Sequence, residues 1–263
     1  MYRFNGGGSM KHSIMVWVYV CLAAFTLAGK TLAYDVGAAV AFSEDPEDVW
    51  FNSVSQFVEI ISSEPTWVQH FLNDYPNVGP YMWTEEEKGN DNFYADYTEL
   101  SLVLGHGVVV VYPDGTKKSA IGFADRGYAL PDDIRLGYAS PDGFGYSVWT
   151  FIIQCSVLGD EYVDDWLQTL QGVHMVLGFA STATISNADF PELAYRLTGT
   201  GGYTREKVES AFFSTFLKSD GVHDDNRARI IAENSEVLDN DYLNSFERVP
   251  VDGSKIIVTG WVG

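Results

Sequence analysis

Two short apolar stretches, each ending in a chemically reactive residue, decide the fold predicted for this sequence. The first is LSLVLGHG at residues 100–107, which ends in His106 and Gly107, and the second is VWTFIIQC at residues 148–155, which ends in Cys155. Runs this short and this apolar are typical of strands covered on both faces, as in parallel sheets. Sites in open α/β sheets form beyond the carboxyl ends of such strands. We therefore expect His106 and Cys155 to emerge side by side at one edge of the sheet.

Strand and helix patterns alternate outward from these two stretches. Further strands are predicted at 35–42, 78–84, 108–112, 119–123, 173–179 and 256–262, and helices at 48–61, 63–73, 161–170, 204–217 and 226–237. The helix at 63–73 is predicted from Pro65 in its first turn and from Trp67 and Phe71 on one face. Short buried strands that alternate with helices predict an α/β sandwich with a mostly parallel sheet.

The charge of the chain excludes several classes of partner. Its 263 residues include 16 Lys and Arg against 36 Asp and Glu, a formal net charge of −20. A chain this acidic is poorly suited to bind the phosphates of nucleic acids or an anionic membrane surface. Its 46% hydrophobic residues are an ordinary globular composition. The sequence carries no phosphate loop, dinucleotide fingerprint or zinc-spaced cluster, so we expect no cofactor and no metal.

The N-terminus has the pattern of a secretory signal peptide. Lys11 and His12 precede an apolar run at 14–28, and small residues lead to Ala33. The run is shorter than the roughly 20 residues of a membrane span, although a retained anchor is an alternative. We expect cleavage after Ala33, a single exported domain over 34–263, and an extracellular location, either free or at the cell surface.

Cleavage after Ala33 changes the cysteine count. It removes Cys21 and leaves Cys155 as the one cysteine of the exported domain, so no internal disulfide is possible. An odd cysteine in an exported protein is an inert buried thiol, an intermolecular link or a reactive nucleophile.

His106, Gly107 and Cys155 together suit nucleophilic catalysis. A thiol reacts as the thiolate, and a neighbouring imidazole lowers its pKa or takes its proton. The backbone N–H groups of Gly107 and Cys155 are candidates for an oxyanion hole, a contribution of roughly 10²–10³ in rate. The predicted catalytic residues are therefore His106 as base and Cys155 as nucleophile.

These motifs resemble the caspase-like (clan CD) cysteine peptidases, which include caspases, gingipains, clostripain, legumain and separase. In that plan an apolar strand ends in His-Gly, and a second ends in the nucleophilic Cys about 50 residues later; here His106 lies 49 positions before Cys155. The run 96–179 is also similar to an uncharacterised, mostly secreted prokaryotic domain family placed near this fold. The resemblance implies a caspase-like three-layer αβα sandwich and a peptide or protein substrate.

The sequence departs from the caspase pattern beside the cysteine. No residue separates Gln154 from Cys155, and Ser156 does not continue with the usual Arg-Gly or Gln-Gly. The resemblance therefore carries over no specificity residue. A pocket lined by Asp142, Asp160 or Glu161 would favour Arg or Lys before the cleaved bond.

Other polar residues have plainer interpretations. His174 begins its strand, so it is expected at the opposite edge in a structural role, and His70 is expected on a helix for packing. His223 lies among Asp220, Asp224 and Asp225, a pattern of metal sites but also of ordinary solvated loops. The stretch 239–241 lacks the full pattern of a calcium loop.

The sequence leaves three functions open. The leading hypothesis is a secreted cysteine endopeptidase-like hydrolase with a His106–Cys155 dyad. A second is a binding or structural module on the same fold without turnover. The third is an unrelated α/β surface protein in which Cys155 is an inert core thiol and His106 a turn residue.

Overall fold

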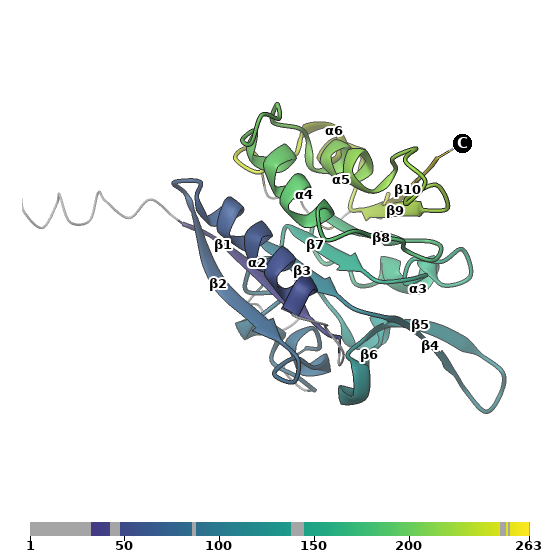
Figure 1. The fold of residues 1–263 in the computed structure, drawn as a ribbon. Helices are drawn as coiled ribbons and strands as arrows, with labels where there is room; N and C mark the ends of the chain where they lie inside the picture. The colour runs from purple at the N-terminus through teal and green to yellow at the C-terminus, as the bar shows by residue number, and fades with distance from the viewer. Residues whose placement is uncertain are drawn as a thin grey trace, which may run out of the picture. The chain divides into compact units, whose positions relative to one another are not determined.

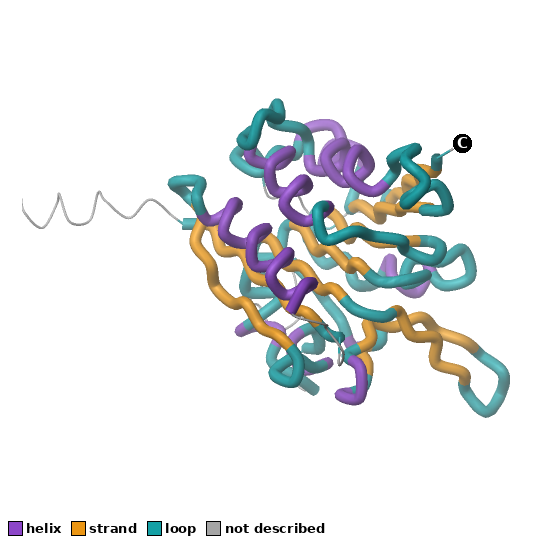
Figure 2. The backbone as a smooth tube through the Cα atoms, viewed as in Figure 1, coloured by secondary structure: helices purple, strands orange, loops and turns teal. Residues whose placement is uncertain are grey.

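A seven-stranded, mostly parallel sheet is the centre of the fold (Figures 1 and 2). The computed structural model describes residues 33–42, 48–85, 88–137, 145–247, 251 and 253–262. The strands follow the spatial order β10-β9-β8-β7-β3-β1-β2. Their bounds are Tyr34–Val40 (β1), Trp67–Asp74 (β2), Leu100–Leu104 (β3), Trp149–Ile153 (β7), Met175–Phe179 (β8), Arg227–Ala232 (β9) and Ile256–Trp261 (β10).

The five strands from β2 to β8 run parallel, and the last two do not. β1 pairs in parallel with β2 and β3, β3 with β7, and β7 with β8. β9 is antiparallel to β8, and β10 is antiparallel to β9. The predicted α/β class with a mostly parallel sheet is confirmed. The two apolar stretches that predicted it form β3 and β7, which are neighbours.

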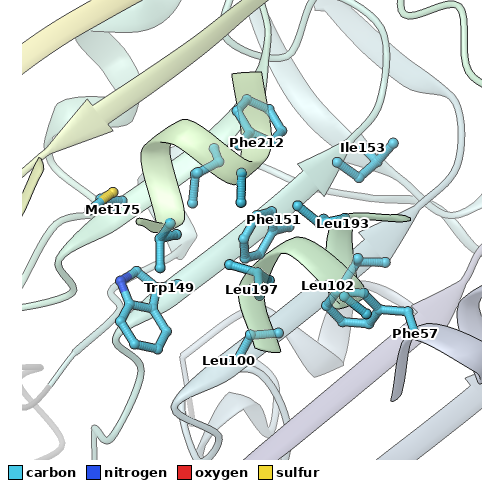
Figure 3. Packing of buried hydrophobic residues seen from close by; sticks show 14 of the residues in the cluster. Phe57, Leu100, Leu102, Trp149, Phe151, Ile153, Met175, Leu193, Leu197 and Phe212 are labelled. Atoms are coloured by element: carbon cyan, nitrogen blue, oxygen red, sulfur yellow. The ribbon is translucent and has the colours of Figure 1, made fainter. Parts of the chain in front are cut away.

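Four helices cover one face of the sheet (Figure 1). They are Val49–Ser62 (α2), Asp189–Thr198 (α4), Val208–Phe216 (α5) and Ser235–Asn240 (α6). Figure 3 shows how Phe57 of α2, Leu193 of α4 and Phe212 of α5 pack with β3 and β7. The packing explains why α2 forms where its apolar residues recur at helical spacing.

Shorter elements cover the opposite face. They are the helix Val163–Leu167 (α3), three-residue 3₁₀ turns such as Pro80–Met82, and a small antiparallel sheet of Gly107–Val111 (β4), Lys117–Gly122 (β5) and Tyr128–Ala129 (β6). Val103 of β3 and Ile152 of β7 point into this second core, whereas Leu102 and Phe151 point into the first. Alternate residues are thus buried on both faces, which is why neither strand shows polar alternation.

Two predicted helices are strands, and one helix was missed. The segment predicted as a helix at 63–73 contains β2, an edge strand, so the four-residue spacing of Trp67 and Phe71 did not indicate a helix. Most of the helix predicted at 226–237 is strand β9. Its Ala and Arg residues favour a helix, but pairing with β8 and β10 makes the segment a strand. The weak strand predicted at 78–84 is a 3₁₀ turn, and α4 was not predicted.

The predicted signal peptide lies outside the described residues, apart from Ala33. Among the described helices, none has both the length and the apolar character needed to cross a bilayer.

Candidate functional site

The structure places His106 and Cys155 just beyond the same edge of the sheet. His106 follows β3 and Cys155 follows β7, and these parallel neighbours end in register at Leu104 and Ile153. Both residues line one cavity of about 400 Å³. The sequence-based expectation that the two residues meet at one edge agrees with this arrangement.

A backbone N–H group points at the Cys155 sulfur. The N–H of Ala183 donates to Sγ over 3.3 Å. The sulfur also lies 4.0 Å from the carbonyl oxygen of Ala183, so the backbone of this one residue meets the thiol through both its N–H and its C=O. Cys155 is half-buried and free of disulfides.

The backbone beside Cys155 is unusual. Ser156 has φ 55°, in the left-handed region, and its N–H donates to the carbonyl of Ser181 over 2.7 Å. A residue other than glycine is held in this region at a cost of about 1–3 kcal/mol, and such residues are frequent at functional sites. The chain therefore turns directly after Cys155, two residues beyond the end of β7.

Gln154 has a structural role. Its side-chain oxygen accepts from the N–H of Gly122 over 2.9 Å, and its Nε2 donates to the carbonyl of Gly122 over 3.0 Å. Gln154 therefore ties the end of β7 to the end of β5, and both ends of its amide are occupied. This agrees with leaving Gln154 out of any specificity role.

Gly107 is needed because the two strand ends approach closely. A Cβ at position 107 would overlap the backbone carbonyl of Cys155. Gly107 is also the first residue of β4 and pairs with Ile121 of β5. The sequence suggested Gly107 for its N–H, whereas the structure adds that only glycine lets the backbone at position 107 come this close to the backbone of Cys155.

Aromatic side chains form one wall of the cavity. The exposed imidazole of His106 meets the ring of Phe42 edge-on, with centroids 4.8 Å apart. Phe42 in turn contacts Trp50, from the first turn of α2, with centroids 6.0 Å apart. Ile153, Ala183, Thr184 and Ile185 complete much of the lining. The imidazole is thus held against an apolar surface at the mouth of the site.

Two side chains hold the loop 181–188, which carries the Ala183 donor. Asn226 accepts from the N–H of Thr184 and donates to its carbonyl, each over 2.8 Å. Asp189 accepts from the N–H of Ser186 over 2.6 Å. Sequence reasoning missed both residues, because no motif marks a side chain whose role is to hold a backbone donor in place.

The chain matches a known family over most of its described length. Residues 66–262 match a family described as domain of unknown function (DUF6345). The chain belongs to the DUF6345 family. No solved structure matches it. The matched segment begins after β1 and α2, yet β1 lies between β2 and β3 in the sheet. It contains both His106 and Cys155.

His223 lies in a second polar group, which we call the acid–histidine cluster: Asp189, Glu192, Lys218, Asp220 and His223. The buried His223 ring contacts Asp220 through Nδ1 and Asp189 through Nε2, at 2.9 Å and 3.0 Å. Lys218 bridges Asp189 and Glu192. Both ring nitrogens are therefore occupied by hydrogen bonds. Within the described residues, no three acidic, histidine or cysteine groups are placed to hold a metal ion.

The carboxylates favour a charged His223. Burial opposes its ionisation, but the hydrogen bonds that His223 donates to Asp189 and Asp220 outweigh burial and raise the pKa of His223. In return, the backbone N–H and the side chain of His223 lower the pKa of Asp220 to about 2. The cluster consists of paired charges, which is a structural arrangement.

The remaining histidines lie elsewhere. His174, at the start of β8, contacts Asp241 through Nδ1 at 2.6 Å, and Trp149 donates to the same carboxylate, so His174 is structural at the opposite edge as predicted. The Asp241 carboxylate is thus occupied by contacts with His174 and Trp149, which argues against a calcium site at 239–241. His70 is on strand β2 instead of a helix, and its ring stacks on Tyr97.

The two described acidic residues considered for a basic specificity pocket, Asp160 and Glu161, do not line this cavity. Asp160 pairs with Arg229 and Arg227, and these hydrogen bonds lower its pKa. Glu161 is exposed and is not among the lining residues. Asp142 lies outside the described residues. The described lining of the cavity contains no carboxylate.

Proposed function

We propose that this domain is a secreted cysteine endopeptidase-like hydrolase, with Cys155 as nucleophile and His106 as its base, on a caspase-like αβα sandwich. The observation that carries the proposal is the shared cavity at the ends of β3 and β7. The hydrogen bond from Ala183 to the sulfur supports it, because it holds the sulfur in place at the cavity.

The proposed chemistry follows from these positions. Cys155 Sγ attacks the peptide carbonyl, and the proton of the thiol passes to His106. His106 then gives this proton to the leaving amine, which departs and leaves a thioester. Water, deprotonated by His106, hydrolyses the thioester and frees the thiol. The N–H groups of Gly107 and Cys155 are the proposed donors to the oxyanion.

One observation favours a second candidate, a binding module on the same fold without turnover. The imidazole of His106 packs edge-on against Phe42, a contact that a purely structural histidine also makes. In this alternative the cavity binds a ligand and Cys155 is an ordinary thiol.

Thiol alkylation separates the two functions. We expect iodoacetamide to modify Cys155 readily at pH 6.5, below the roughly 8.5 pKa of an ordinary thiol. His106→Ala should slow the reaction about tenfold or more, because the variant lacks the base that takes the proton of the thiol. His70→Ala is the matched control, because His70 lies on the edge strand β2. Peptide mapping by mass spectrometry identifies the modified cysteine.

The outcome that contradicts the proposal is equally clear. Slow alkylation with the same rate in wild type and His106→Ala would identify Cys155 as an inert thiol. The binding module would then be the better description of the domain.

A further inference from the structure

The cavity beside Cys155 has walls that suit one kind of side chain. Five of its lining residues are apolar: Phe42, Trp50, Ile153, Ala183 and Ile185. Its volume of about 400 Å³ is within the roughly 300–1,000 Å³ of ligand pockets. It opens directly at the proposed nucleophile, so whatever occupies it lies next to the bond under attack.

Charge is missing from this lining in the part of the chain that the structure describes. Apart from the imidazole of His106, the lining residues are apolar, glycine or uncharged polar. Thr184 has its backbone bound by Asn226, and the amide of Gln154 is bound to Gly122. A buried lysine, arginine or aspartate side chain would find no counter-ion among these residues, and such burial is costly.

Two acidic residues that the structure describes near the cavity, Asp189 and Asp160, are paired with other groups. Asp189 follows the loop 181–188, but it is buried against Lys218 and His223. Asp160 follows β7 and is paired with two arginines. The strong negative charge of the chain is therefore not directed into the cavity by these two carboxylates.

We propose that this cavity is the specificity pocket of the hydrolase and that it takes a bulky apolar side chain, aromatic or branched aliphatic, next to the scissile bond. This inference rests on the proposed function, because only the substrate of a hydrolase has a scissile bond. Binding of a side chain to the pocket can still be tested without turnover. It departs from the sequence-based suggestion of a basic side chain.

Binding to a variant without the nucleophile tests the pocket alone. In Cys155→Ala protein, acetylated tripeptide amides that differ only in a C-terminal Phe, Leu, Arg or Asp would be titrated and followed by NMR chemical shifts. We expect the Phe and Leu peptides to bind about tenfold or more tightly than the Arg and Asp peptides, because they bury apolar area without desolvating a charge. Tighter binding of the Arg or Asp peptide, or equal binding of all four, would overturn the proposal.

A variant that reverses the preference sharpens the test. Ile185→Asp places a carboxylate in the lining of the pocket, and we expect it to weaken Phe binding and to make Arg the preferred peptide. Val251→Asp is the matched control, because Val251 is exposed and outside the pocket. Unchanged preference in Ile185→Asp, with folding verified by circular dichroism, would overturn the assignment of this pocket.

Hydrolysis then separates the pocket from the function. Wild-type protein would be assayed with fluorogenic amides of the same four peptides. Cleavage of the Arg or Asp substrate alone would support the proposed peptidase function and overturn the proposed apolar specificity of the pocket. Preferred binding of the Phe peptide, with no substrate cleaved and an inert thiol, would sustain the apolar pocket and overturn the peptidase.

Discussion

Two histidines near the same loop have opposite surroundings. His223 is buried in the acid–histidine cluster, where both ring nitrogens contact carboxylates. His106 is exposed at an apolar cavity, and its ring rests against Phe42. In the sequence, His223 lies among acidic residues, a pattern shared by metal sites and ordinary solvated loops, whereas His106 was singled out by its place at the end of an apolar strand. The comparison teaches that a dense group of charges can be fully used in holding the fold, whereas chemistry needs a group that still faces open space.

The loop 181–188 joins the two regions. Asp189 accepts from His223 through the same oxygen that accepts from the N–H of Ser186. Three residues before Ser186, the N–H of Ala183 reaches the sulfur of Cys155. The acid–histidine cluster therefore holds the loop 181–188, whose Ala183 N–H donates to the sulfur. A substitution in the cluster should also change the surroundings of Cys155.

Removing His223 should have the largest effect on stability. His223→Ala leaves the buried Asp189 with one partner fewer, and breaking a buried charge pair costs about 3 kcal/mol or more in the free energy of unfolding. His70→Ala, on the edge strand, should cost about 1 kcal/mol or less. Urea denaturation of both variants measures the difference. Equal losses in the two variants would show that the cluster is not a support.

The close approach of the backbone at Gly107 and Cys155 should also matter for stability, on the cavity side of the loop. Gly107→Ala forces the added methyl into the carbonyl of Cys155, so a strand end must shift. We expect a loss of about 2 kcal/mol in the free energy of unfolding. The rate of Cys155 alkylation should also change, because the thiol moves relative to His106.

Gly253→Ala is the control for that substitution. A Cβ at position 253 meets open space, and the residue has no left-handed φ. Its effect should stay within about 0.5 kcal/mol. If Gly107→Ala matched this control in both stability and alkylation rate, the close contact would not constrain the site.

The sequence predicted the centre of this fold better than its edges. β3 and β7 are short and buried on both faces, so their apolar runs admit few other structures and place His106 and Cys155 at one edge. β2 is an edge strand with exposed residues between Trp67 and Phe71, and this spacing resembles one face of a helix. The local spacing of apolar residues predicts the wrong element where pairing with strands distant in the sequence determines the structure.

The candidate site was also predictable only in part. Two reactive side chains at matching strand ends are visible in a sequence. The N–H of Ala183 is not, because every residue except proline carries one, and its position depends on Asn226, far along the chain, and on Asp189 at the start of α4. The lining of the cavity by Phe42 and Trp50 likewise follows from the placement of β1 and α2 beside β3.

The pH dependence of stability should report the acid–histidine cluster. The pKa of His223 is raised above 6.5, so its contribution is complete below about pH 6.5 and is lost as the pH rises through the folded pKa. The pKa of Asp220 is lowered from 3.8 to about 2, so its contribution is present above about pH 4 and is lost as the pH falls toward 2.

Variants separate the loss of stability at high pH, the alkaline limb, from the loss at low pH, the acid limb. We expect His223→Ala to remove the fall in stability on the alkaline side, and Asp220→Asn to reduce the fall on the acid side, where Asp114, Asp132 and Asp160 also contribute through their lowered pKa values. Urea midpoints measured from pH 2 to 9 supply the curves. An alkaline limb that survives in His223→Ala would contradict the assignment.

The smallest expected effect on stability belongs to the proposed nucleophile. Cys155 is half-buried, and Cys155→Ala removes one sulfur atom and its hydrogen bond from Ala183. We expect the free energy of unfolding to change by about 1 kcal/mol or less, while all alkylation at this position and any hydrolysis disappear. Cys155→Ser keeps an acceptor for Ala183 and should be as stable as wild type. A loss above about 2 kcal/mol in both variants would instead mark Cys155 as a packing residue. That result would reverse the comparison, because the cavity, like the acid–histidine cluster, would then serve the fold.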